Sequence, residues 1–300
     1  MRYDVTLALN YDYGGPADHA RNMLRVLPRD LPGRQLVSSE QVTVDPLPCE
    51  RRDTVDFFGN RVTQLAFEEP VRQLEIKMHA RVDVFAAEPA FDLSPRPETL
   101  CDDLAGLRDI GPNAPHHFLH ASPRVPLDRD MTAWAQAQVP RGMTTCETVL
   151  QIGAALGRDM HFDSTVTDVD TPPAQAFRNR RGVCQDFSHV MIACLRGLGI
   201  PAGYVSGFLR TEPPVGQPRL SGADAMHAWV RAWCGGQAGW IEYDPTNTVV
   251  AGLDHLVIGY GRDYADIAPV RGAVRAAGLQ MSGHTVDVVP WLSARGTMPV

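Results

Sequence analysis

The chain has 300 residues, of which 44% are hydrophobic and 21% are charged, a composition typical of a globular protein with room for two domains. Its formal net charge of −7 argues against nucleic acid or an anionic membrane as the main partner, because both repel a negative surface. The first residues alternate polar and apolar side chains, and no apolar run has the length of a signal-peptide core or a membrane span.

Residues 1–85 are predicted to form an antiparallel β domain, sandwich-like in architecture. Apolar and polar side chains alternate over Tyr3–Leu9 and again over Leu74–Val84, the pattern of strands with one buried face. Gly59 and Asn60 separate two further strand-like segments and predict a two-residue hairpin turn between them.

Residues 86–130 are rich in proline, which denies regular backbone hydrogen bonding, and they are predicted to form a connector with short helical pieces. A second domain is predicted over residues 131–275, where helical signals begin. Thr144–Glu147 is typical of a capping box ahead of an apolar helix. Thr171, followed by two prolines, predicts another helix start, and Gly182 is expected to end that helix.

The next predicted helix has a buried face. From Cys184 onward apolar side chains recur at helical spacing, and Gly199 before Ile200–Pro201 marks the end of the helix. Three later segments have the composition of strands, namely 202–209, 226–233 and 240–243. One helix packed on antiparallel strands predicts an α+β core. The C-terminal segment 276–300 is expected to add a last strand at Val286–Val289.

Cys184 is the first candidate for chemistry, because it stands at the predicted start of the buried helix, just after Arg180 and Arg181. The partial positive charge of a helix N-terminus and nearby cations favour the thiolate, which is the nucleophilic form of cysteine. The small Gly182 leaves room for a substrate backbone. The alternative is an inert buried cysteine, which is what we predict for Cys194 on the apolar face of the same helix.

A thiolate enzyme needs an imidazole to carry a proton and a third group to orient that imidazole. His227 begins one predicted strand, and Asp244 ends the next one. Adjacent antiparallel strands bring such ends together, so a His227–Asp244 hydrogen bond is expected. Taken alone, each residue favours a structural role, a partly buried histidine and a turn-capping carboxylate. Their occurrence together with Cys184 favours catalysis.

A recognisable pattern is spread over four segments of the chain. They are the helix start, the turn after the helix and two strands, at Arg181–His189, Gly199–Ala202, Met226–Val230 and Tyr243–Asn247. In this order they resemble the core of the transglutaminase-like superfamily. The N-terminal strands around Phe57–Asn60 and the tail at Gly261–Pro269 are also similar to bacterial members of that group. The resemblance therefore covers most of the chain.

The resemblance implies a papain-like core in which Cys184 is the nucleophile, His227 the general base and acid, and Asp244 the group that orients the imidazole. It implies acyl transfer on a peptide or protein amide through a thioester, with water or a primary amine as the acceptor. The backbone N–H of Cys184 is expected to be one oxyanion donor, and the second is not identified. No cofactor and no metal are expected.

Two other classes of function stay open. One is a catalytically silent binding or scaffolding protein that retains the fold. The other is a zinc protein that uses His116, His117 and His120, which we favour less because no cysteine or carboxylate stands at a supporting interval.

Two further expectations concern location and substrate access. The six cysteines form no CxxC pair and no regular framework, so reduced thiols and a cytoplasmic location are expected. The loop at 210–222 directly precedes His227 and is expected to border the substrate cleft.

Overall fold

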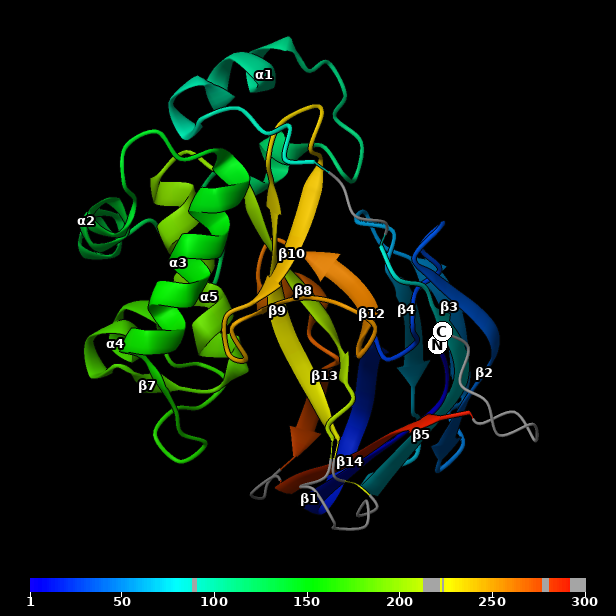
Figure 1. Cartoon of the computed structure of the whole chain (residues 1–300). Coiled ribbons are helices and arrows are strands. Elements are labelled where there is room, and N and C mark those ends of the chain that lie inside the picture. The colour runs from blue at the N-terminus through cyan, green and yellow to red at the C-terminus, as the bar shows by residue number, and fades with distance from the viewer. Residues whose placement is uncertain (88–90, 213–221, 223, 277–280, 292–300) are drawn as a thin grey trace.

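The computed structural model describes residues 1–87, 91–212, 222, 224–276 and 281–291. Its elements in chain order are β1 (Arg2–Leu24), β2 (Gln35–Asp45), β3 (Glu50–Val55), β4 (Arg61–Ala66), β5 (Val71–Val84), the 3-10 turn η1 (Pro97–Thr99), α1 (Leu100–Gly106), the 3-10 turn η2 (Pro115–Phe118), α2 (Arg129–Gln138), α3 (Thr145–Asp159), β6 (His161–Phe162), α4 (Pro173–Asn179), β7 (Arg181–Gly182), α5 (Cys184–Gly197), β8 (Ala202–Leu209), β9 (Ala225–Trp233), β10 (Trp240–Asp244), β11 (Val249–Val250), β12 (His255–Gly261), α6 (Tyr264–Ile267), β13 (Val270–Ala276) and β14 (Met281–Pro290). The predicted α+β class is confirmed, with antiparallel strands first and a mixed core after them (Figure 1).

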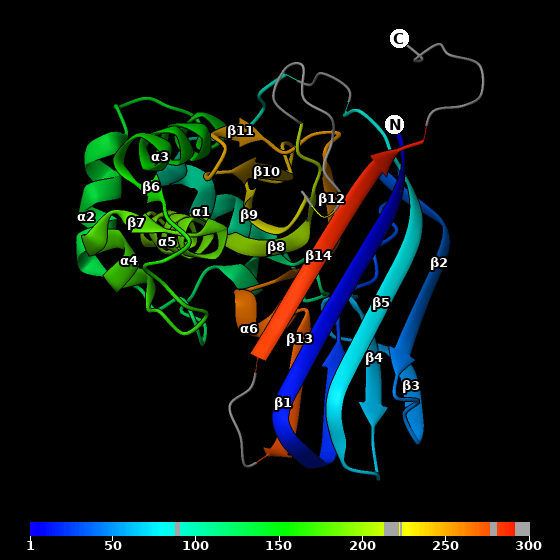
Figure 2. The same ribbon diagram turned by 90° about the horizontal axis from the view of Figure 1, so that it is seen from below.

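The N-terminal sheet is organised around the long strand β1. Its first part, residues 2–12, pairs with β5 on one side and β14 on the other, as Figure 2 shows. Its second part, residues 17–24, pairs with β4 and β13. The pairing register shifts between Asp12 and Ala17, around Gly14, whose φ of +64° suits glycine. Both parts contribute to one apolar core, so the sandwich-like arrangement is made by a single bent sheet.

The turn between β3 and β4 is longer than the predicted two-residue hairpin, because residues 56–60 all lie outside the strands. The Asp56 carboxylate accepts the backbone N–H of Asn60 at 2.9 Å, and the Gly59 N–H donates to the Asp56 carbonyl at 3.0 Å. Asn60 has a second role that a hairpin turn would not allow. Its side chain bonds the backbone of Tyr260, which lies in the second sheet.

The core sheet has the strand order β11-β10-β9-β8-β12. Helix α5 packs on one face, where the side chains of Ala228, Val230 and Ala232 meet its apolar stripe. The N-terminal sheet covers part of the other side, since Phe208 and Leu256 belong to its core (Figure 1). The predicted helix packed on antiparallel strands is therefore present, and its sheet lies between helices and a second sheet.

The backbone groups of the edge strand β12 are hydrogen-bonded by side chains of the N-terminal domain. The amide of Gln35 accepts the N–H of Val257 and donates to its carbonyl, each at 2.8 Å. The amide of Asn60 does the same for Tyr260, at 2.8 and 2.7 Å. An edge strand presents unpaired backbone groups, and here two amide side chains take the place of a neighbouring strand.

Helix α4 ends earlier than predicted. It begins after Pro172 and ends at Asn179, because the next residue, Arg180, has a φ of +54° that breaks the helical path. Gly182 is needed for a different reason. A Cβ atom there would lie 2.5 Å from the Asp186 carboxylate, so only glycine leaves space for that side chain at the start of α5.

The C-terminal part of the chain returns to the first sheet. The predicted boundary at residue 275 falls inside β13, which pairs with the second part of β1. The strand expected at Val286–Val289 lies within β14, which pairs with the first part of β1. The N-terminal sheet is thus built from both ends of the described chain.

Candidate active site

Cys184 is the first residue of α5 and is half-buried. The segment that leads into the helix is held by Asp186, whose Oδ2 accepts the Val183 N–H at 2.8 Å and the Thr167 hydroxyl at 2.7 Å. This arrangement places the sulfur at the positive end of the helix dipole, where the first N–H groups lack intrahelical acceptors.

His227 and Asp244 lie on neighbouring antiparallel strands, near the start of β9 and at the end of β10. The distance from His227 Nε2 to Asp244 Oδ2 is 2.7 Å. Asp244 has no exposed surface, and 8% of the His227 surface is exposed. The structure therefore brings the two side chains together as the strand pairing predicts.

The Asp244 carboxylate accepts hydrogen bonds from several directions. Oδ2 accepts from His227, from the Asn247 side-chain amide at 2.7 Å and from His255 Nε2 at 3.1 Å. Oδ1 accepts the backbone N–H groups of Thr246 at 2.9 Å and Asn247 at 3.2 Å. Burial alone raises the pKa of Asp244, but these donors outweigh burial and hold its pKa well below the ordinary value. The group is a permanent anion.

The His227 imidazole links that anion to the thiol. Nε2 faces Asp244, and Cys184 is close enough to be among the groups that raise the pKa of the imidazole. Burial by itself lowers the pKa of His227, whereas the bonds to Asp244 and Cys184 raise it, to about 10. The arrangement therefore favours an imidazolium beside the sulfur.

A buried polar network lies against the His227 ring through Trp229. The Trp229 ring stacks on it, with centroids 6.2 Å apart and planes inclined by 29°. The Trp229 indole donates to Glu242 at 2.6 Å, and the Tyr260 hydroxyl donates to the same carboxylate at 2.9 Å. The guanidinium of Arg34, in the segment between β1 and β2, donates hydrogen bonds to both oxygens of Glu242. The N-terminal sheet thus reaches the groups behind the site.

The two arginines before Cys184 have other partners. The Arg180 guanidinium lies 4.0 Å from the Phe177 ring centroid and 5.7 Å from that of Trp134. Arg181 is paired with Asp163 at 3.4 Å. We expected both arginines to act as cations beside the sulfur, but their side chains make these contacts instead.

Histidines outside the Cys184 site make structural contacts. His189 Nε2 accepts the Tyr264 N–H at 3.2 Å, and burial lowers the pKa of its ring to about 4. His116 and His117 bond backbone carbonyls at 3.2 and 3.0 Å. Within the described ranges, no group of three or more His, Cys, Asp or Glu side chains is placed to hold a metal ion.

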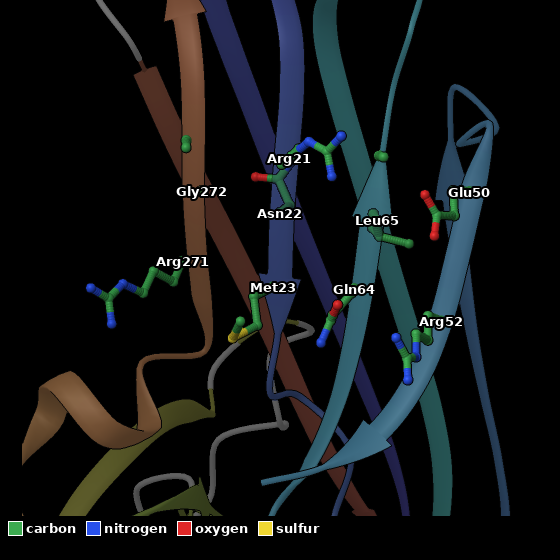
Figure 3. Close-up of a pocket in the computed structure, with 11 residues that line it drawn as sticks. Arg21, Asn22, Met23, Glu50, Arg52, Gln64, Leu65, Arg271 and Gly272 are labelled. Atoms are coloured by element: carbon green, nitrogen blue, oxygen red, sulfur yellow. The ribbon is translucent and has the colours of Figure 1, made fainter.

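A pocket of about 320 Å³ lies elsewhere, on the outer face of the N-terminal sheet. Figure 3 shows it over β1, β3, β4 and β13, and the guanidinium groups of Arg21, Arg52 and Arg271 point in different directions. None of the residues that line it belongs to the Cys184 site. Because the polar groups around this pocket do not converge on one point, we assign it no catalytic or binding role.

Sequence reasoning missed the second histidine on Asp244 and the amide role of Asn247. His255 opens an apolar strand, Leu256–Ile258, and a polar side chain at that place is a usable signal. Most of the loop predicted to border the cleft, residues 213–221, lies outside the described residues. Among the helices that the described ranges contain, none combines the length and the apolarity of a membrane span.

Comparison with known proteins covers both parts of the chain. Residues 132–245 match the family described as the transglutaminase-like superfamily, and residues 3–83 match the bacterial transglutaminase-like N-terminal region. An uncharacterised protein of Mycobacterium tuberculosis is 33% identical over 294 residues, which cover 97% of this chain and 93% of the relative. One of Mycobacterium leprae is 29% identical, over 96% of this chain and 98% of the relative.

The fold also has a solved counterpart. A crystal structure from Cytophaga hutchinsonii, named a "putative cysteine protease", has a TM-score of 0.75 with 23% sequence identity. The match covers 96% of this chain and 90% of that chain. It shows that the bent N-terminal sheet and the mixed core occur together in another protein.

Proposed function

Since the chain belongs to the transglutaminase-like superfamily, we propose that it performs cysteine-dependent acyl transfer on peptide or protein amides, with Cys184, His227 and Asp244 as its triad. The observation that supports this most is the 2.7 Å contact between His227 and Asp244, with Cys184 among the groups that raise the pKa of His227. Nucleophile, proton carrier and orienting carboxylate are the three groups that such a reaction needs.

In the proposed first step, the Cys184 thiolate attacks the amide carbonyl carbon. The carbonyl oxygen becomes an oxyanion, and the backbone N–H of Cys184, at the start of α5, stabilises it. The C–N bond then breaks, the amine takes the Nδ1 proton of His227, and a thioester remains on the sulfur. Asp244 stays ionised throughout and keeps the imidazole in one orientation.

In the second step, the neutral His227 removes a proton from the acceptor as the acceptor attacks the thioester. Water as acceptor releases a carboxylic acid, which makes the enzyme an amidase or protease. A primary amine as acceptor releases a new amide, which makes it a transglutaminase. Both routes return the thiolate and the imidazolium, so the same residues serve either reaction.

The test is the reactivity of Cys184 toward a limiting amount of iodoacetamide near neutral pH, followed at each cysteine by peptide mass spectrometry. Cys184 is expected to react faster than the exposed Cys49 and Cys101, and His227→Ala is expected to slow it, because the imidazolium no longer stabilises the thiolate. Equal, slow labelling of Cys184 in both proteins would favour a silent scaffold instead.

The acyl group is identified by a second experiment. A peptide library is mixed with the enzyme, the reaction is quenched in acid, and the peptide that contains Cys184 is analysed by mass. A mass increase on Cys184 identifies the acyl donor, and Cys184→Ala serves as the blank. Repeating the reaction with a primary amine present distinguishes hydrolysis from amide exchange by the mass of the released product.

We further propose a cytoplasmic location. All six cysteines are free thiols, and two of them are exposed, which suits a reducing compartment. Cell fractionation with a tagged full-length chain tests this, and recovery in an oxidising compartment would contradict it.

A further inference from the structure

Two histidines share one oxygen of Asp244. His255 is the first residue of β12, and only 5% of its surface is exposed. Its Nε2 lies 3.1 Å from Asp244 Oδ2, the same atom that bonds His227 at 2.7 Å. Three strands of the core sheet, β9, β10 and β12, therefore each supply one member of a His–Asp–His cluster.

The surroundings of His255 assign its tautomer. The Gly252 N–H donates to Nδ1 of the ring at 3.3 Å, so that nitrogen carries no proton. The single proton of the neutral ring then resides on Nε2 and is donated to Asp244.

The His255 ring is also fixed in place. Its own backbone N–H donates to the Gly252 carbonyl at 3.1 Å, which closes a tight turn before β12. The Trp229 indole meets the ring edge-on, with centroids 5.1 Å apart and planes at 79°. The same indole stacks on His227. The ring is thereby fixed as a second donor to Asp244 Oδ2.

We propose that His255 is a positioning residue of the triad, which fixes the Asp244 carboxylate as the acceptor for His227 and weakens its hold on the His227 proton. This role rests on the proposed function. The ionisable groups that meet here are His227 of β9, Asp244 of β10, His255 of β12 and, through His227, Cys184 of α5. Without the second donor, Asp244 would turn more freely and bind the imidazolium proton more tightly.

The test compares two replacements of His255. His255→Met has a similar volume and no donor, whereas His255→Gln keeps an N–H group that reaches toward Asp244. His79→Met, at an exposed histidine of β5, is the matched control. The measurements are the labelling rate of Cys184 by iodoacetamide from pH 5 to 10, the melting temperature, and the imidazole ¹⁵N spectrum of the full chain.

The wild-type spectrum is expected to show His255 as the Nε2–H tautomer. His255→Met is expected to slow labelling of Cys184 about tenfold at pH 7, at the low end of the loss seen when an orienting partner is removed. The alkaline end of its pH profile is expected to move to higher pH. His255→Gln should retain labelling within about threefold of wild type, since it restores the donor, and His79→Met should match wild type.

The proposal fails if His255→Met has the wild-type labelling profile, whatever its melting temperature, or if His255→Gln labels as slowly as His255→Met. An Nδ1–H tautomer for His255 overturns it as well. Failure of the proposed function gives a different result. In that case wild-type Cys184 reacts no faster than Cys49, and His227→Ala changes nothing, while the tautomer of His255 still tests the bond to Asp244.

Discussion

The Asp244 carboxylate lies out of contact with solvent, yet it keeps its charge because side-chain and backbone donors surround both oxygens. Asp244→Asn preserves the size of the side chain and removes the charge that holds His227 as an imidazolium. We expect turnover, and the labelling rate of Cys184, to fall by about 10²- to 10⁴-fold, as in other triads that lose this group. Asp18→Asn, at an exposed position of β1, is the control and should change neither rate.

His227 makes stability depend on pH in a defined direction. Its pKa is raised from 6.5 to about 10, because the bonds to Asp244 and Cys184 outweigh the effect of burial. A raised pKa contributes stability that is complete below pH 6.5 and is lost as the pH rises through about 10. The free-energy difference between wild type and His227→Ala should therefore shrink from pH 6 to pH 10. Urea unfolding at pH 6, 8 and 10 measures it, and a difference that grows with pH would contradict the assignment.

At the scale of one element, the start of α5 depends on the space left by Gly182. A Cβ atom there would lie 2.5 Å from Asp186 Oδ2 and 2.7 Å from Asp186 Cβ. Gly182→Ala should displace Asp186 from the Val183 N–H, cost about 1–3 kcal/mol of stability and slow the labelling of Cys184. Gly106→Ala, where a Cβ meets nothing within 4 Å, is the matched control. Thermal unfolding of both variants checks the difference.

The elements that could be predicted are those with one buried face. The apolar stripe after Cys184 and the alternation in the strands follow directly from burial on one side, and these segments are helix α5 and strands β1, β5, β8 and β9. The end of α4 at Asn179 could not be predicted, because the positive φ belongs to Arg180, whereas glycine usually adopts it and Gly182 stood nearby. The prediction of a two-residue hairpin turn was wrong for a related reason. The Asn60 side chain bonds a distant strand, and the local sequence does not reveal that contact.

The candidate site was predictable as a cluster but not in its full extent. Cys184, His227 and Asp244 each stand at the end of an element, and the strand order brings the last two together. His255 comes from β12, which is separated from β10 in the sheet by β9 and β8. No spacing rule in the sequence shows that it reaches the same carboxylate oxygen. That contact depends on how the whole sheet is assembled.

At the scale of the molecule, the pair Arg34–Glu242 joins the N-terminal sheet to the groups behind the site. Arg34→Met leaves the Glu242 carboxylate buried without its cation. We expect a loss of about 2–4 kcal/mol, less than for a fully enclosed pair, because Arg34 is 32% exposed and Trp229 still donates to Glu242. The double variant Arg34→Met, Glu242→Gln should regain part of the loss. Urea unfolding of Arg34→Met, Glu242→Gln and the double variant measures the losses, and additive losses would contradict the pairing.

The return of β13 and β14 to β1, on the side opposite β4 and β5, sets an order on synthesis. While the ribosome is still making the core, β1 has β5 and β4 beside it but lacks both of its C-terminal partners. At that stage the backbone N–H and C=O groups along one side of β1 are unpaired, because the strands that pair with them have not yet been translated. The sheet that supplies Arg34 and Gln35 to the core matures only when residues 270–290 have emerged.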